Sequence, residues 1–598
     1  MTNIKSNKDK FLAVIIFIIN LIPYFILSEG FISSTILLIG VIYIFKRKFK
    51  IFIDGYILIC LLTSIMGIIS LKQSMNIISS IEGIAIYLCG IIFYYIFYNL
   101  KDKKEYVYDL FVYSFTIGVL VFTGIQGIVM NKRVDGNIGY ANTYAILIIV
   151  SLYINRIRQN DKFKVLIEYI LITGVLYTGS RYSLLFLGIF IVAEIILVRK
   201  YKSNSKVMIN LILAIVTYTI CSKLGPMAVI LMPPIIYGIY YINSNSNLKL
   251  KKVLNLTLMI SSLGFICMGN TQLFLRVKNI SIHNPVLQER FIYYEDSIKA
   301  ILSNIVGFGL NSFQYRQYGI QSAFYDVKYI HNSLIQDMFD LGILGGILFI
   351  SLFIYGLIYI NKNINNKKIY YLMMYVSIYA HSMLDFDFSF ATLIIIISMI
   401  LALNKKDSVY IYKEMKDKHL SNIIKLIITV LSVYLICCNL FIFIGGVYED
   451  NREFYVAKMF YKINERLTFG KNAETYGLLA EVSNGEERIN MLYKAEKLNP
   501  YDPRIKLNIA FSNENNNAFY DADKYYEKVL KIERFNKEVY SKYYLFLKKA
   551  YNTTKDKTFL HKQYKLKELY NENLKRLNNR AKYIKNQMPQ NFNEVVRS

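Results

Sequence analysis

Long apolar runs separated by short charged loops make up the first three quarters of the chain. The runs lie near residues 11–28, 30–45, 51–70, 78–98, 109–130, 140–155, 165–179, 182–198, 207–222, 225–242, 254–269, 342–360, 369–382, 388–403 and 421–447. Many come close to the roughly 20 residues that a helix needs to cross a hydrocarbon core of about 30 Å. Because each span must satisfy its own backbone hydrogen bonds, the pattern predicts an all-α, polytopic helical membrane protein with about 14 to 15 spans.

The loops between these runs alternate in charge. One set carries about thirty Lys and Arg residues, whereas the short loops of the other set carry about five. The positive-inside rule places the first set and the N-terminus in the cytoplasm, and an odd number of spans then places the C-terminal region outside the cell. We therefore expect a multi-pass protein of the cell membrane, with the 270–332 loop and the C-terminal domain extracellular. The net charge of +28 reflects this orientation, and no nucleic-acid partner is predicted.

The six cysteines all lie within or at the ends of apolar runs, so no disulfide framework is predicted. No small-residue cleavage site follows the run at 11–28, and we interpret that run as an uncleaved first span.

The polar tail at 450–598 contains a weak internal repeat. Residues 491–502 superpose on 525–536 at an offset of 34, and the first of these segments contains an Asn-Pro pair near its end. That period and that ending are typical of tetratricopeptide repeats, whose helix pairs stack because none buries its apolar face alone. We predict a tetratricopeptide-like helical domain that binds a partner, for which a protein is the candidate. The alternative of an amphipathic helical tail without true repeats remains open.

Several arginines stand out because they lie in loops predicted to be outside. Arg133 lies in the loop at 131–142, and Arg181 lies in a tight turn between two apolar runs. A guanidinium at the membrane boundary is costly unless it is paired, so these are functional candidates, with snorkelling to lipid headgroups as the alternative. Residues 286–304 have amphipathic spacing that predicts an interfacial helix, on which Arg290 is either functional or a helix cap.

Two histidines lie at predicted junctions between loop and membrane. A lone histidine is more often structural, but His331 lies near the same predicted plane as the arginines, which favours a catalytic role. His381 and Asp385 are four residues apart and share a helix face, with Asp387 beside them. We expect them to support the catalytic group, since one histidine and two carboxylates are weak evidence for a metal.

Two carboxylates inside predicted spans keep a different function open. Glu82 and Glu168 have no obvious cation partner in their helices, and proton-coupled transporters use such groups.

Taken together, these segments resemble the O-antigen ligase/polymerase superfamily of bacterial envelope glycosyltransferases over roughly residues 130–400. The resemblance rests first on His331-Asn-Ser and the following Leu-Gly-Ile-Leu-Gly run. Gly179-Ser180-Arg181, the segment 306–313, Arg290 and the loop from Arg133 to Asn142 are also similar. The chain departs from the family with Tyr140-Ala-Asn142 for Asn-Pro-Asn, Tyr293-Tyr294 for a tryptophan, and Ser-Arg-Tyr-Ser for Ser-Arg-Gly-Ala.

The resemblance implies transfer of a glycan from undecaprenyl pyrophosphate to an acceptor hydroxyl or a growing chain, without a nucleotide sugar, cofactor or metal. It implies that Arg181 and Arg290 bind the pyrophosphate, where guanidinium forks match the phosphate oxygens. His331 would be the general base that accepts the proton of the attacking hydroxyl. Arg133, Ser180 and Asn332 would be further substrate-binding residues. The implied partners are the lipid-linked glycan, a glycan, lipid or protein acceptor, and the lipid bilayer.

The predicted organisation is therefore N-terminal transmembrane helices at 1–130, a catalytic transmembrane region at 131–447 and an external helical domain at 450–598. Two other functions remain as alternatives: a flippase or transporter of lipid-linked oligosaccharides, and a membrane-anchored repeat scaffold. The placement of the arginines and His331 on one side argues against both. Polymerase, ligase and protein O-glycosylation are not separable from the sequence.

Overall fold

The computed structural model describes residues 28–45, 52–159, 163–201, 207–225, 281, 283–364, 367–406, 413–414, 418–584 and 587–597. In these residues the regular structure is helical, apart from one antiparallel pair of two-residue strands, β1 (Phe52–Ile53) and β2 (Lys413–Glu414). The predicted spans at 11–28, 225–242 and 254–269 lie outside the described residues. The fold class is all-α, as predicted.

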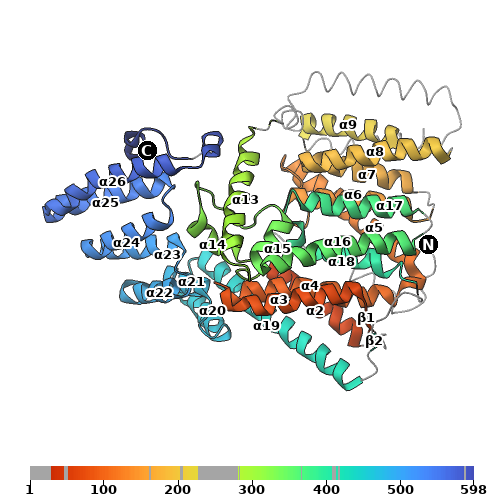
Figure 1. Cartoon of the computed structure of the whole chain (residues 1–598), viewed down its shortest axis with the longest axis horizontal. Coiled ribbons are helices and arrows are strands. Elements are labelled where there is room, and N and C mark those ends of the chain that lie inside the picture. Colours follow the sequence, from red (N-terminus) through yellow and green to blue (C-terminus); the bar gives the residue numbers. More distant parts are fainter. Residues whose placement is uncertain are drawn as a thin grey trace.

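Apolar helices pack into one bundle with a continuous buried core (Figure 1). They are α2 (Glu29–Phe45), α3 (Gly55–Ser70) with η1 (Leu71–Gln73), α4 (Ile77–Tyr98), η2 (Lys101–Lys103), α5 (Lys104–Phe122) with the π-helical η3 (Thr123–Val129), α6 (Ala141–Ile157), α7 (Lys164–Thr178), α8 (Arg181–Tyr201), α9 (Val207–Leu224), α16 (Ile343–Asn363), α17 (Lys368–Ser382), α18 (Ala391–Ala402) and α19 (Lys418–Asp450). Two helices are central: α4 packs against α2, α3 and α18, and α6 packs against α5, α7 and α17.

Six of the described helical segments are long and apolar enough to cross a membrane. They are Gly55–Gln73, Ile77–Tyr98, Lys101–Val129, Val207–Leu224, Ile343–Asn363 and Asn422–Asp450. The segment within α19 is the least buried of the six and exposes Leu426, Ile427 and Val430, as expected of a helix that contacts lipid. The described part of the chain is thus a polytopic helical membrane protein.

The predicted span at 388–403 has a different character. It contains α18, which has only 12 residues and is buried along its whole length. Such a helix is about 18 Å long, too short to cross a bilayer by itself. Its apolar side chains face other helices, which hydropathy alone cannot distinguish from lipid.

Among the described residues, loops from the two sets distinguished by charge lie at opposite ends of the bundle. The more basic set meets where α6 ends: Lys367 Nζ donates to the Ile157 carbonyl at 2.7 Å. At the other end, where α6 begins, Arg133 Nε donates to the Thr178 carbonyl at 2.8 Å. The predicted alternation therefore matches the geometry, while the side that faces the cytoplasm stays a prediction.

The basic end also corrects one expectation. Glu168 does have a cation partner, because Arg156 lies 2.7 Å from its carboxylate and 3.2 Å from that of Glu194. This pairing explains Glu168 without proton transport.

Short helices lie between the bundle and the C-terminal domain. They are α13 (Pro285–Ser303), α14 (Phe313–Ile320), α15 (Ser333–Leu341) and η5 (Asp387–Ser389). The predicted amphipathic helix at 286–304 corresponds to α13. Two glycines follow its end, and Gly307 and Gly309 both have positive φ, at 91° and 98°.

The C-terminal segment forms a second helical body with its own apolar core (Figure 1). Its helices are α20 (Phe454–Leu467), α21 (Ala473–Glu481), α22 (Gly485–Leu498), α23 (Pro503–Asn515), α24 (Phe519–Ile532), α25 (Lys537–Thr554), α26 (Lys557–Arg576), η6 (Asn579–Tyr583) and α27 (Phe592–Arg597). α22 and α24 begin 34 residues apart, as do α23 and α25. This spacing agrees with the period found in the sequence, while membership of the tetratricopeptide family stays a prediction.

The end of this domain contacts α13. Arg580 Nε lies 2.9 Å from the Glu295 carboxylate, and the Asn578 amide donates to the Ser322 carbonyl at 3.0 Å. The C-terminal domain therefore buttresses the segment between α13 and α15, in addition to any partner that it binds.

Candidate active site

The His-Asn-Ser motif forms the start of α15 and ties it to the loop after α17. His331 adopts a left-handed conformation with φ of 49°, which costs a non-glycine residue about 1–2 kcal/mol. Asn332 caps the helix by accepting from the Ile335 amide at 3.1 Å, and its own amide donates to the Met383 carbonyl at 2.9 Å. The Ser333 hydroxyl donates to the Asp385 carbonyl at 3.1 Å. The motif thus holds the loop that carries Asp385 against His331.

His331 and Asp385 form a close pair. His331 Nδ1 lies 2.9 Å from Asp385 Oδ1, and the Asp385 side chain is fully buried. The imidazole is 18% exposed, and its Nε2 has no hydrogen-bond partner in the described part of the chain. A proton on Nδ1 that is donated to the carboxylate leaves Nε2 as a free acceptor. That tautomer is the one a general base requires.

The carboxylate of Asp385 is held by further donors. The Tyr140 hydroxyl lies 3.0 Å from both of its oxygens, and Asn142 Nδ2 lies 2.8 Å from Oδ2. Burial by itself would raise the pKa of this carboxyl, but the hydrogen bond from His331 and the positive charges of His331 and Arg290 lower the pKa below its usual range. Asp385 is therefore ionised at neutral pH.

Arg290 on α13 faces the same pair. Its Nη1 donates to the Leu384 carbonyl at 2.5 Å, and its Nη2 lies 3.2 Å from His331 Nδ1 and 3.7 Å from Asp385 Oδ2. Nδ1 cannot donate to Asp385 and accept from Arg290 at the same time, and the shorter contact to the charged acceptor favours Asp385. Burial opposes the charge of Arg290, but Asp385 and the nearby tyrosines together more than offset it and raise the arginine pKa. Only 6% of the Arg290 side chain is exposed.

Arg133 and Arg181 differ in the number of hydrogen bonds that their guanidinium groups make within the protein. Arg133 is committed to the Thr178 carbonyl and to Asn142 Oδ1, at 2.8 and 3.0 Å, which joins it to the network around Asp385. Arg181 is the first residue of α8, is half-buried and has no hydrogen bond or ion pair to any residue that the structure describes. The neighbouring Tyr182 ring lies 5.5 Å from the Arg290 guanidinium, so Arg181 starts its helix beside the same cluster.

Three helices begin around this cluster. Tyr140 immediately precedes α6, Arg181 opens α8, and His331 lies two residues before α15. Helix N-termini carry partial positive charge and free amide donors, which favour anions. The arginines add formal charge of the same sign. The arrangement can therefore bind a polyanionic group next to a histidine base.

A second histidine pair lies behind the first. His381 Nδ1 is 2.6 Å from Asp387 Oδ2, and the Thr143 hydroxyl donates to Asp387 Oδ1 at 2.7 Å. His381 Nε2 lies 3.4 Å from the Ser183 hydroxyl. Among the described residues, no group of three His, Cys, Asp or Glu side chains is placed to hold a metal ion.

The structure separates some residues that the sequence placed together. Ser180 is 1% exposed, and its hydroxyl donates to Ser183, which connects it to His381 instead of His331. α17 ends at Ser382, so Asp385 lies in the following loop and not on one helix face with His381. Tyr293 packs on the His331 ring, with centroids 6.0 Å apart, and is too deeply buried to stack on a sugar.

Tyr140 is the site residue that sequence reasoning missed. Its hydroxyl contacts Asp385 and lies 3.3 Å from His331 Nδ1, although in the sequence it was only a departure from the family pattern. Its place directly before an apolar run beside Asn142 was the available signal.

Two glycines set the loop that positions α15. A Cβ at Gly342, where φ is 74°, would lie 1.9 Å from the Ile305 carbonyl oxygen. A Cβ at Gly307 would lie 2.3 Å from the Gly342 amide nitrogen. Because both contacts are backbone atoms, no side-chain movement relieves them.

Gly342→Ala should therefore destabilise the protein by about 2–4 kcal/mol, from backbone strain and the steric clash. The measurement is the thermal unfolding temperature in detergent. Gly188→Ala is the matched control, because a Cβ there meets no atom within 4 Å. Equal unfolding temperatures for the two variants would contradict the close approach.

Comparison with known proteins places this cluster in a family. A search of proteins of curated function finds no match. Residues 168–350 match the family model described as O-Antigen ligase, a segment that includes Arg181, Arg290 and His331 but neither Arg133 nor Asp385. The chain thus carries an O-antigen ligase domain of the O-antigen ligase/polymerase superfamily, as the motifs around these three residues predicted.

Proposed function

We propose that this protein is a membrane glycan transferase that moves a glycan from undecaprenyl pyrophosphate to an acceptor hydroxyl or a growing chain. The reaction takes place at the outer membrane face and serves the assembly of a surface polysaccharide or glycoconjugate. The main support is that a histidine–carboxylate pair lies beside arginines and helix N-termini, within and next to the O-antigen ligase domain. The domain supports membrane glycan ligation or polymerisation, and the donor, acceptor and topology are parts of the proposal.

In the proposed step, the acceptor oxygen attacks the anomeric carbon of the donor glycan. The bond from that carbon to the phosphate oxygen breaks, and the electron pair leaves with undecaprenyl pyrophosphate. The hydroxyl proton passes to His331 Nε2, and Asp385 stabilises the imidazolium through its contact with Nδ1. His331 then releases the proton to solvent, and a new glycosidic bond remains.

The arginines would take different parts in this step. Arg181 has its guanidinium available and is proposed to contact the pyrophosphate directly. Arg290 uses its guanidinium on the Leu384–Asp385 segment, so it is proposed to position that segment and to add positive charge near the leaving group. Arg133, Asn332 and Ser180 contribute mainly by holding these elements in place.

Arg181→Ala and Arg290→Ala should separate these two parts. Arg181→Ala should weaken donor binding about 10- to 100-fold, as expected for lost hydrogen bonds to a charged group, without lowering the unfolding temperature. Arg290→Ala should lower both, because it removes a buried cation from Asp385. Equilibrium binding of radiolabelled lipid donor and thermal unfolding measure the two effects. A loss of stability in Arg181→Ala would contradict the assignment of a free guanidinium.

The test of the function uses purified protein and lipid-linked oligosaccharide from membranes of the source cells. A ladder of longer lipid-linked glycans would support polymerisation, whereas transfer only to an added acceptor would support ligation. If neither product forms from an active lipid donor with a panel of glycan, lipid and protein acceptors, that result would count against a transferase.

A further inference from the structure

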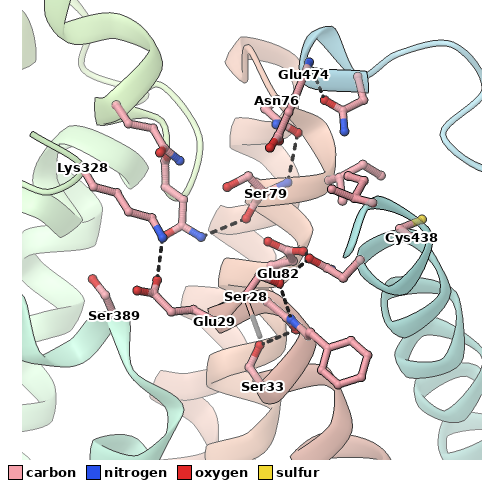
Figure 2. A pocket seen from close by; sticks show the side chains of 18 of the residues that line it. Ser28, Glu29, Ser33, Asn76, Ser79, Glu82, Lys328, Ser389, Cys438 and Glu474 are labelled. Atoms are coloured by element: carbon pink, nitrogen blue, oxygen red, sulfur yellow. Dashed lines mark hydrogen bonds and ion pairs between the residues drawn. The ribbon is translucent and has the colours of Figure 1, made fainter. Parts of the chain in front are cut away.

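A polar cavity lies where the bundle meets the C-terminal domain (Figure 2). Its volume is about 300 Å³. Its walls come from the starts of α2, α4 and α14, the end of η5, the segment before His331, the second half of α19 and the start of α21. Seven segments thus line the cavity, and the C-terminal domain completes it with Asn472 and Glu474.

Side-chain amides and carboxylates dominate the polar part of this lining. The amides are Asn76, Asn311, Gln314, Asn439 and Asn472, and the carboxylates are Glu29, Glu82 and Glu474. Amides donate and accept hydrogen bonds, and carboxylates accept several, which suits a ligand with many hydroxyl groups. Phe443, 41% exposed, adds an apolar surface to the same wall.

The charge of the cavity excludes the pyrophosphate end of a lipid donor. Lys328 is its one basic residue, and Lys328 Nζ is paired with Glu29 at 2.9 Å. Glu82 accepts from Asn439 at 2.6 Å, and neither Glu82 nor Glu474 has a cation partner in the described part of the chain (Figure 2). With that lysine paired, the described lining offers no free positive charge to a pyrophosphate. The cavity and the arginine cluster are therefore suited to different ligands.

Two polar groups in the cavity, the Asn472 amide and the Glu474 carboxylate, are available to bind a ligand. Asn472 is 2% exposed, and its carbonyl oxygen caps α21 by accepting from the Glu474 amide at 3.0 Å. Its Nδ2 and the Glu474 carboxylate have no hydrogen-bond partner among the described residues. An amide held by its capping contact beside an exposed, unpaired carboxylate can bind two neighbouring hydroxyls, or a hydroxyl and an amine.

The cavity is joined to His331 through a short aromatic wall. Lys328 and Tyr329 line it and precede His331 by three and two residues. The Tyr329 ring stacks on Phe386 at 4.6 Å, and Phe386 packs edge-on against His331 at 4.8 Å. The Tyr329 hydroxyl donates to Glu29 at 2.5 Å, which fixes this wall to the cavity. The Tyr329 and Phe386 rings therefore separate the cavity from His331, so a saccharide in the cavity would have to extend past them to reach the histidine.

We propose that this cavity binds the acceptor, and that the acceptor is a neutral or amine-bearing saccharide. The proposal rests on the proposed transferase function and names its acceptor class. The donor pyrophosphate would then bind at the arginines and the acceptor sugar in the cavity, two separate places in the fold.

A binding measurement tests the cavity independently of turnover. The chain contains no Trp, so Phe443→Trp places a single indole in the cavity wall. The probe is the free oligosaccharide that mild acid releases from the native lipid donor. Saturable change of indole fluorescence with this oligosaccharide, and none with inorganic pyrophosphate, is the expected result. Leu545→Trp, on exposed α25 surface, is the matched control and should not respond.

The variant Glu474→Gln, added to the Phe443→Trp protein, tests the chemistry of the site. It keeps the size of the side chain and should weaken oligosaccharide binding about 10- to 100-fold, the effect of losing charged hydrogen bonds. Glu486→Gln on α22 should leave binding unchanged. No fluorescence response, an equal response to pyrophosphate, or undiminished binding in Glu474→Gln would each overturn the proposal.

The transfer assay keeps the two proposals distinguishable. If the wild type transfers glycan, Glu474→Gln should raise the acceptor KM by a similar factor and leave the donor KM unchanged. If the wild type transfers glycan and Glu474→Gln has the same acceptor KM as the wild type, the assignment of the acceptor site would be overturned and the transferase function would stand. Oligosaccharide binding without any transfer would leave the cavity assignment standing and count against the transferase.

Discussion

His331→Ala is expected to lower the rate of glycan transfer by about 10²–10⁴-fold, the usual contribution of a general base. The imidazole lies where the Asp385 carboxylate holds one nitrogen and leaves the other free, so its loss removes the proton acceptor for the attacking hydroxyl. The measurement is the initial rate of product formation from lipid-linked oligosaccharide. Donor binding should change little, because the one charged side chain among the described residues that the His331 imidazole contacts as a hydrogen-bond donor is Asp385, and the proposed donor contacts come from the arginines.

His561→Ala is the control for this prediction, since His561 is exposed on α26 of the C-terminal domain. It should retain the wild-type rate. Full activity of His331→Ala would remove the base from the mechanism, whereas loss of donor binding as well as rate would point to a structural role. The substitution should add little backbone strain, because the left-handed conformation at position 331 costs alanine about as much as it costs histidine.

Asp385→Asn is expected to lower transfer by about 10²-fold or more, even though it preserves the shape of the side chain. The asparagine amide is able to donate to His331 Nδ1, which moves the imidazole proton to Nε2 and blocks the base. The variant also leaves Arg290 facing a neutral group. The initial rate and the donor affinity, measured separately, should show a fall in rate with a smaller loss of binding.

Asp521→Asn, an exposed substitution on α24, is the control for removing a negative charge. It should leave the rate unchanged. An active Asp385→Asn protein would show that His331 obtains its tautomer without the carboxylate, and the proposed proton path would then be wrong.

The depressed pKa of Asp385 also predicts how stability depends on pH. A carboxyl whose folded pKa lies below its unfolded value of about 3.9 contributes stability that is present above that value and is lost as the pH falls toward the folded pKa. The difference in unfolding temperature between wild type and Asp385→Asn should therefore be constant near neutral pH and shrink below about pH 4. A difference that grows on acidification would contradict the ionised, paired carboxylate.

Much of the fold follows from local patterns along the chain. Apolar runs of nearly 20 residues predict α3, α4, α5 and α16 because each span satisfies its backbone within itself, whatever its neighbours. The amphipathic spacing of 286–304 predicts α13 for the same local reason. The run that became α18 shows the limit of this reasoning, since hydropathy reports that a segment avoids water but not whether lipid or protein covers it.

The candidate site divides along the same line. His331, Arg181 and Arg290 could be chosen from the sequence because each is a charged or titratable group next to an apolar run. Their partners could not, because Tyr140 and Asp385 lie 245 residues apart and meet only through the packing of α6 and the loop after α17. Ser180 looked equivalent to Arg181 by sequence, yet the turn directs it to Ser183 and the second histidine.

The sequence by itself determined the apolar helices and the candidates for the base and the arginines, and it predicted the alternation of the loops. These depend on periodicity, on charge and on short motifs, all of which are local. Only the tertiary structure decided which carboxylate orients His331, which arginine stays free, and that a cavity forms against the C-terminal domain. Those features depend on contacts between distant segments, whose geometry arises when buried polar groups must find partners in a closely packed interior.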